Sequence, residues 1–174
     1  MKYFITSERL GFSKWENGYF LLAKRLWGDI EVTKLIDARG VLDDSQIKEK
    51  LEIEISNEQK FGVQYYPIFL LEGNDFVGCC GLRPYDLERE IYEIGFHLIP
   101  KYWRRGLAFE AAKRIITFAF DEKQADKIFA GHNPKNTASK KLLTKLQFSY
   151  IGDEFFKPTG LYHPSYILEK NKGD

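Results

Sequence analysis

The sequence has little excess charge and very little cysteine, and both shortages narrow the possible functions. Its 26 Lys and Arg residues nearly balance its 25 Asp and Glu residues, which leaves a net charge of +1. Nucleic-acid-binding proteins usually carry a strong basic excess, so we expect no nucleic-acid partner. The two cysteines, Cys79 and Cys80, are adjacent in the apolar run FVGCCGL. Because neighbouring strand residues point to opposite faces, we expect two reduced thiols rather than a disulfide.

Three further patterns are missing. Two cysteines and three scattered histidines do not supply a metal site at these spacings, so no metal is expected. The start MKYFITSERL has no apolar signal segment, and no stretch approaches the length of a membrane span. The phosphate-binding pattern G-x-x-x-x-G-K-[ST] of nucleotide hydrolases is absent. We therefore expect a cytoplasmic protein with no membrane partner and no nucleotide hydrolase activity.

The composition that remains is that of an ordinary globular protein. The chain has 174 residues, of which 44% are apolar and 16% aromatic. This is enough apolar bulk for one core and for the lining of a pocket. No repeat or Pro/Gly/Ser-rich linker divides the sequence, so we expect one domain over residues 1–174.

The order of the predicted elements indicates an α+β, or mixed α/β, fold. The stretch 43–61 has helical spacing, an Asp/Ser start and a stop at Gly62. A strand, a helix and another strand at residues 90–134 predict a right-handed parallel crossover in a sheet that is otherwise largely antiparallel. The remaining predictions are a short strand at 7–15, helix and turn at 16–35 with 28–36 the clearest piece, a hairpin at 65–85, a short helix at 137–148 and closing strands at 149–156 and 161–170.

The helix predicted over residues 107–122 has a narrow apolar face and an open first turn. Small residues dominate the face, so this helix can lie close to a sheet. The N–H groups of a first turn are free and carry the positive end of the helix dipole. Arg104 and Arg105 add positive charge there, and Gly106 adds no side chain. This arrangement suits a bound anion, although two solvated arginines before a glycine turn would read the same. The face consists of Ala108, Ala111, Ala112, Ile115 and Ala119.

Three motifs resemble the GNAT N-acetyltransferase superfamily. The stretch YWRRGLAFEA, after a strand ending in EIGFHLIP, resembles the signature [QR]-x-x-G-x-[GA], with Trp103 at its first position. NPKNTASKKLLTKLQF resembles the N-x-x-S helix and K-L-G-F ending, with Asn136 and Ser139 matching and Gln147 replacing the glycine. TSERLGF resembles the T-E-R-L opening of the branch that contains the ribosomal-protein N-terminal acetyltransferases. The likeness runs in order across nearly the whole chain.

The resemblance implies a fold and a cosubstrate. The fold would have a central, mostly antiparallel sheet of six to seven strands, a splayed parallel pair at its centre and about four flanking helices. Acetyl-CoA would lie at that pair, with its pantetheine arm against the backbone of Phe96 and Leu98. Asn136 and Ser139 would contact the arm or the thioester, and Asn136 also suits a helix cap. The pyrophosphate would sit on the backbone of Arg104, Arg105, Gly106, Leu107 and Ala108.

The implied reaction is acetyl transfer to a primary amine, by direct attack in a ternary complex. The amine would belong to a protein N-terminus or a small molecule, and the enzyme would be a monomer or homodimer. Glu93 is the candidate base, acting directly or through water, although a surface carboxylate on a strand reads the same. Ser139 resembles the serine proposed as the acid in the ribosomal-protein branch. The alternative role of Ser139 is a hydrogen bond to the cofactor or to the backbone. Leu143 stands where many members carry an acid tyrosine.

Two points remain open in the sequence. Tyr150 and Tyr166 are phenols that the sequence does not place, and His163 is a candidate for the border of the acceptor site, whereas Tyr65 is expected in the core rather than in a pocket. The alternative function is a non-catalytic, CoA-binding or sensory domain. Leu143 and Gln147 keep that alternative open.

Overall fold

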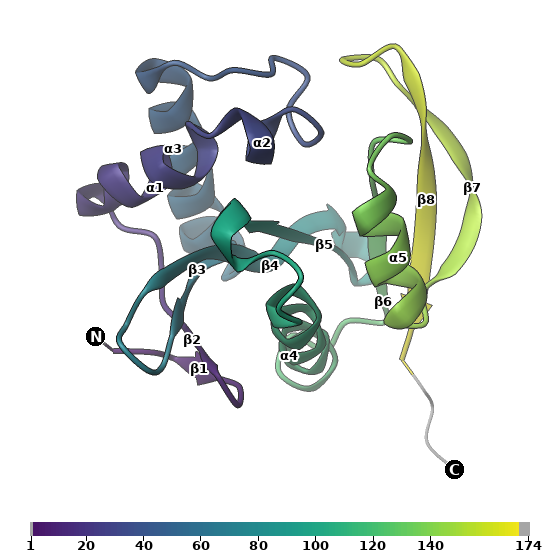
Figure 1. The fold of residues 1–174 in the computed structure, drawn as a ribbon. Coiled ribbons are helices and arrows are strands. Elements are labelled where there is room, and N and C mark those ends of the chain that lie inside the picture. The colour runs from purple at the N-terminus through teal and green to yellow at the C-terminus, as the bar shows by residue number, and fades with distance from the viewer. Residues whose placement is uncertain (1, 171–174) are drawn as a thin grey trace.

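The computed structural model describes residues 2–170, which form a mixed α/β fold around one sheet of eight strands (Figure 1). The strand order is β1-β2-β3-β4-β5-β6-β8-β7, and β5 and β6 are the parallel neighbours. The predicted fold class is confirmed. The strands are β1 (Ile5–Thr6), β2 (Leu10–Phe12), β3 (Tyr65–Leu70), β4 (Phe76–Asp86), β5 (Ile91–Leu98), β6 (Lys127–Gly131), β7 (Ser149–Phe156) and β8 (Leu161–Glu169).

The strand count of six to seven was too low because the opening stretch folds back on itself. A tight turn, in which the Ser7 N–H donates to the Leu10 carbonyl at 2.8 Å, separates β1 from β2. The two short strands then pair antiparallel, with Ile5 opposite Phe12. A single strand was predicted where the structure has a small hairpin.

The described residues contain five α-helices rather than about four. The difference lies in residues 16–35, where the stretch with the clearest helical signal forms only the four-residue α2. The longer α1 precedes it and buries Ala23, Leu26 and Trp27. Gly28 and the capping Asp29 separate the two helices. The helices are α1 (Phe20–Trp27), α2 (Ile30–Thr33), α3 (Asp44–Phe61), α4 (Leu107–Asp121) and α5 (Thr137–Lys145), and three-residue 3-10 turns occupy Asn17–Tyr19, Leu87–Arg89 and Pro100–Tyr102.

Helix α3 begins and ends where the sequence predicted. The Asp43 carboxylate accepts from the Gln46 N–H at 2.9 Å, and the Gln46 side chain accepts from the Asp43 N–H at 3.0 Å. This reciprocal capping box satisfies two free donors of the first turn. Gly62 ends the helix in a left-handed conformation with φ 66°, which glycine adopts without a Cβ clash. Local side-chain chemistry therefore sets both boundaries.

Helix α4 covers the sheet through its small residues and forms the crossover between the parallel strands β5 and β6. Ala111, Ala112, Ile115 and Ala119 are fully buried, and Ala108 is partly buried. The predicted face is thus confirmed. Phe118 of α4 also contacts the ring of Tyr66, which alternation places on the other face of β3 from Tyr65. Figure 1 shows α1, α2 and α3 grouped apart from α4, and α5 beside β6 and β8.

The parallel strands part directly after Glu93. Their register pairs are Ile91 with Lys127, Tyr92 with Ile128 and Glu93 with Phe129, and no later pair joins them in the described residues. β5 nevertheless continues to Leu98. The expected splayed pair is therefore present, with unpaired strand edges on the C-terminal side of Glu93.

The two cysteines are free thiols in β4, and both are buried. Burial raises the pKa of both thiols, so neither forms a thiolate readily.

Candidate active site

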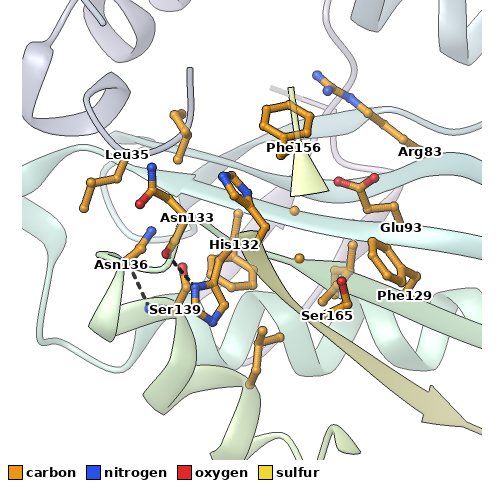
Figure 2. A pocket seen from close by; sticks show the side chains of 18 of the residues that line it. Leu35, Arg83, Glu93, Phe129, His132, Asn133, Asn136, Ser139, Phe156 and Ser165 are labelled. Carbon is orange, nitrogen blue, oxygen red and sulfur yellow. Dashed lines mark hydrogen bonds between the residues drawn. The ribbon is translucent and has the colours of Figure 1, made fainter. Parts of the chain in front are cut away.

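A cavity of about 330 Å³ lies where β5 and β6 part (Figure 2). Its wall includes four residues that the sequence assigned to the site, namely Glu93, Phe96, Asn136 and Ser139. They come from β5 and from the first turn of α5, which are remote in the sequence. The strand gap thus brings the candidate base and the candidate acid to one cavity.

Glu93 is a partly buried carboxylate in the wall of this cavity. Its Oε1 accepts a hydrogen bond from the Tyr65 hydroxyl at 3.3 Å, and Arg83 is its register partner on β4. Burial raises the pKa of Glu93, while the Arg83 charge and the Tyr65 hydrogen bond lower it, and the net shift is upward. A carboxylate with a raised pKa is a stronger proton acceptor than an exposed one.

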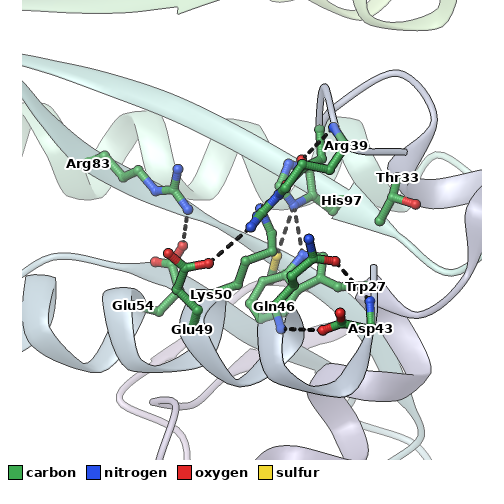
Figure 3. Close-up of polar contacts among 12 residues, drawn as sticks. Trp27, Thr33, Arg39, Asp43, Gln46, Glu49, Lys50, Glu54, Arg83 and His97 are labelled. Atoms are coloured by element: carbon green, nitrogen blue, oxygen red, sulfur yellow. Dashed lines mark hydrogen bonds and ion pairs between the residues drawn. The ribbon is translucent and has the colours of Figure 1, made fainter. Parts of the chain in front are cut away.

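A fully buried carboxylate, Glu54 of α3, contacts Arg83 and Tyr65, the two residues that lie next to Glu93. It forms an ion pair with Arg83 (Figure 3). Its Oε2 also accepts from the Tyr65 main-chain N–H at 2.7 Å. The Arg83 guanidinium lies 4.1 Å from the centroid of the Tyr65 ring. Because a buried charge is costly without a partner, Glu54 holds Arg83 in place.

Asn136 caps α5, so the cap that the sequence suggested is present. Its Oδ1 accepts from the Ser139 N–H at 3.1 Å. The Asn136 Nδ2 group and the Ser139 hydroxyl have no partner within residues 2–170, and both residues line the cavity. Leu143, one turn further along, is buried in the same wall and brings no proton.

The loop before α4 displays free main-chain donors. Arg104 and Gly106 adopt left-handed conformations, with φ 58° and 75°. Within residues 2–170, the N–H groups of 104–109 have no acceptor. The only atom within 4 Å of a Cβ built on Gly106 belongs to the Arg9 guanidinium, at 3.6 Å, so no main chain covers this turn. The loop lies outside the wall of the 330 Å³ cavity.

Trp103 connects this loop to the end of β5. Its indole N–H donates to the Leu98 carbonyl at 2.7 Å. Leu98 is buried and does not line the cavity, and its carbonyl already has this partner. The tryptophan thus fastens the loop to the strand.

The sequence did not single out two residues at the loop, Arg9 and Glu110. The Glu110 carboxylate accepts from the Arg9 main-chain N–H and from Arg9 Nε, each at 2.7 Å, and from the Ser7 hydroxyl at 2.7 Å. Arg9 Nη1 also donates to the Arg105 carbonyl at 3.1 Å. Arg9 belongs to the T-E-R-L opening, and this motif was the sequence signal that could have identified Arg9.

Some of the aromatic and histidine candidates line the cavity, and others do not. Tyr65 was predicted to be core; it is buried and also lines the cavity. His163 lines the cavity, and burial, with His132 nearby, lowers its pKa. Tyr150 and Tyr166 do not line it. Tyr150 is exposed, and its hydroxyl donates a hydrogen bond to Asp153 Oδ1. The Tyr166 hydroxyl lies 3.4 Å from His132 Nε2.

These features together define a class of protein. Parallel strands that part, a nearby helix start with free N–H groups, and a partly buried carboxylate in the cavity wall are features of a CoA-dependent acyltransferase. The acetyltransferase (GNAT) domain family matches residues 9–149. The chain belongs to this family, and it is accordingly an acetyltransferase.

Individual relatives agree with this assignment. The uncharacterized N-acetyltransferase p20 of Bacillus licheniformis is 30% identical over 146 residues, which are 84% of this chain and 82% of the relative. A solved GNAT-family acetyltransferase from Bacillus anthracis superposes with a TM-score of 0.80 at 26% identity, over 95% of this chain and 97% of that one.

A ribosomal-protein acetyltransferase shares the fold. RimL, solved in complex with coenzyme A and described as a ribosomal L7/L12 alpha-N-protein acetyltransferase, superposes with a TM-score of 0.82 at 14% identity, over 97% of this chain and 98% of that one. The predicted likeness to this branch is thus present at the level of the fold.

Two further features are absent from the described residues. No group of three or more His, Cys, Asp or Glu side chains within residues 2–170 is placed to hold a metal ion. Across the same residues, no helix combines the length and the apolar character that a membrane crossing requires.

Proposed function

We propose that this chain, acting as one domain over residues 1–174, transfers an acetyl group from acetyl-CoA to a primary amine by direct attack in a ternary complex. The observation that carries the proposal is the partly buried Glu93 carboxylate at the point where β5 and β6 part. We place the reaction in the cytoplasm, in a monomer or homodimer, without a metal or nucleic acid.

The residues present fit acetyl-CoA. Six consecutive N–H groups without an acceptor within residues 2–170, and the Arg9 guanidinium as the nearest side chain above Gly106, suit a pyrophosphate. The unpaired edge of β5 at Phe96 and the amide group of Asn136 are available to the pantetheine arm. The Leu98 carbonyl already accepts from Trp103, so only the Leu98 N–H would be available to the arm. The pyrophosphate contacts would come from the backbone of Arg104, Arg105, Gly106, Leu107 and Ala108.

Bound there, acetyl-CoA supplies the acetyl group as a thioester. Glu93 takes a proton from the acceptor ammonium, directly or through water, so that the free amine can attack. The Ser139 hydroxyl donates a proton to the leaving sulfur, because Leu143 at the usual tyrosine position cannot. Both roles use atoms that face the same cavity.

The charges of the cavity wall favour an acceptor without a carboxylate beside its amine. Lys50 is paired with Asp37 at 3.1 Å, and Arg83 with Glu54, so the charge of each cation is already balanced by a carboxylate of the protein. Glu93 attracts the ammonium. We therefore propose a protein N-terminus, as in RimL, or a small amine, and expect free α-amino acids to be poor acceptors.

The test is Glu93→Gln, assayed by mass spectrometry against N-terminal peptides and small amines. We expect kcat to fall about 10²- to 10⁴-fold with acetyl-CoA affinity unchanged, because only the proton transfer is lost. Glu154→Gln, which changes the other glutamate of the cavity wall, is the matched control. Full turnover in Glu93→Gln would contradict the base assignment. Tight acetyl-CoA binding with no turnover by the wild type would favour the non-catalytic alternative, for which Leu143 is the specific observation.

A further inference from the structure

Tyr65 reaches Glu93 because a glycine lies beneath its ring. Tyr65 is opposite Gly81, and Gly81 is opposite Gly95, so all three lie in one row across β3, β4 and β5. A Cβ on Gly95 would lie 2.3 Å from the Tyr65 Cζ and 2.5 Å from its hydroxyl oxygen. Only glycine therefore lets the ring lie over β5. Side chains two residues apart share a face, so the hydroxyl meets Glu93.

The other side of the Tyr65 ring is also closed. The Arg83 guanidinium lies 4.1 Å from the ring centroid and is itself held by Glu54. The His97 ring packs nearly perpendicular to the Tyr65 ring, with 5.6 Å between centroids and an interplanar angle of 82°. The Tyr65 side chain is thus buried and confined to one position, from which its hydroxyl donates to Glu93 Oε1 at 3.3 Å.

The hydrogen bond leaves one oxygen of Glu93 for chemistry. Burial, and then the negative charge of Glu93, raises the pKa of Tyr65, so the phenol keeps its proton and remains a donor. Glu93 Oε2 has no partner within residues 2–170. In the proton transfer, an N–H bond of the ammonium breaks, the proton moves to Oε2, and nitrogen keeps the electron pair for attack on the thioester carbon.

We propose that Tyr65 is the positioning residue of the base: it binds Glu93 Oε1 and so directs Oε2 toward the acceptor amine. This inference rests on the proposed acetyl transfer. Tyr65 acts through Glu93 and is not itself a proton carrier.

The role has a signature in the pH dependence. A hydrogen bond to a carboxylate favours its charged form, so removing the Tyr65 hydroxyl raises the pKa of Glu93 further. The acid limb of kcat/KM for the acceptor then moves to higher pH. The substitution retains the other titratable groups at this corner, which are Arg83 and Tyr85 of β4, His97 of β5, Lys50 and Glu54 of α3, Glu154 of β7 and His163 of β8.

The experiment compares Tyr65→Phe with Tyr66→Phe. Both substitutions remove one hydroxyl from adjacent buried tyrosines, but Tyr66 donates to Glu58 at 3.2 Å, away from Glu93. For Tyr65→Phe we expect the acid limb to rise by about 0.5–1 pH unit, with turnover below the limb reduced about 3- to 10-fold and the KM for acetyl-CoA unchanged. Tyr66→Phe should leave the limb in place.

A second variant and a second measurement keep the inference testable if Tyr65→Phe unfolds. Gly95→Ala keeps both polar groups but forces the ring away, so it should shift the limb in the same direction. The pKa of Glu93 is read directly by carboxyl ¹³C NMR, with its signal assigned by its absence in Glu93→Gln. An unchanged limb and an unchanged NMR titration in these variants would overturn the role of Tyr65, even with Glu93 essential. Absence of any acetyl transfer would instead overturn the proposed function, and the NMR titration would still decide the Tyr65 contact.

Discussion

Gln147 occupies a backbone conformation that suits glycine. It follows α5 with φ 65°, its N–H donates to the Thr144 carbonyl, and the Phe148 N–H donates to the Leu143 carbonyl, each at 3.0 Å. This is the pairing of a Schellman motif, whose left-handed position is usually glycine. The family ending K-L-G-F has glycine there, so the departure seen in the sequence is a strained turn rather than a changed fold.

At the residue scale we therefore predict that Gln147→Gly stabilises the protein. Relief of a left-handed strain of about 1–2 kcal/mol exceeds the entropy that glycine adds to the unfolded chain, about 0.4–1 kcal/mol, which leaves a net gain of roughly 0.5–1 kcal/mol. Urea unfolding measures this free energy. The same change at the exposed Gln59, inside α3, should destabilise by roughly 0.5–1 kcal/mol. Equal effects at the two positions would contradict the backbone argument.

At the scale of elements, the turn between β1 and β2 is fastened to the start of α4. Three donors from Ser7 and Arg9 converge on the Glu110 carboxylate, and Arg9 also binds the Arg105 carbonyl. Burial alone would raise the pKa of Glu110, but the hydrogen bonds from Ser7 and Arg9 lower it below its usual value of 4.5. The ionised carboxylate therefore favours the folded state.

We predict a pH-dependent loss of stability in Glu110→Gln. A lowered folded pKa contributes stability that is complete above the unfolded pKa and is lost as pH falls through the folded pKa. At pH 7 the variant should be less stable by about 0.5–1.5 kcal/mol, since Arg9 is half-exposed and solvent screens the pair. The deficit should shrink below pH 4.5, the usual pKa of this carboxyl. Urea unfolding at several pH values tests this.

Glu122→Gln is the control at the opposite end of α4. Its ion pair with Arg114 is exposed and 3.9 Å long, so its removal should change little at any pH. A deficit in Glu110→Gln that stays constant with pH would show that its charge is not the cause.

At the scale of the whole molecule, binding of acetyl-CoA links the start of α4 to the parted strands. A ligand bound only by the folded protein at 100 times its Kd adds about 2.7 kcal/mol, which corresponds to a rise in Tm of roughly 5–10 °C at this chain length. We predict that Gly106→Glu abolishes this rise, because its side chain fills the open turn with bulk and negative charge.

The matched control for Gly106→Glu is Gly73→Glu. Gly73 has a similar left-handed φ, 81° against 75°, and open space around it, but lies in the turn between β3 and β4. It should lose comparable stability and keep the full thermal shift with acetyl-CoA. Loss of the shift in both variants would show a general effect of strain instead of a pyrophosphate site.

Local patterns predicted much of this fold. Asp43 and Gly62 marked the ends of α3, and the alanines of α4 marked its buried face, because caps and helical periodicity act over a few residues. The count of strands failed at Ser7–Leu10, where the deciding hydrogen bond belongs to a turn with no glycine or proline to announce it. The site was predicted in part: Glu93 and Ser139 share a cavity, but Tyr65 looked like simple core because burial and pocket lining draw on the same residue types.

By itself, the sequence determined the succession of helices and strands and the open, positively charged start of α4, since both depend on neighbours along the chain. The tertiary structure alone decided that β5 and β6 part after Glu93, that Tyr65 crosses Gly95 to reach that carboxylate, and that Arg9 meets Glu110. These contacts join residues 28 and 101 positions apart, and their geometry comes from sheet register and packing, which no local pattern specifies.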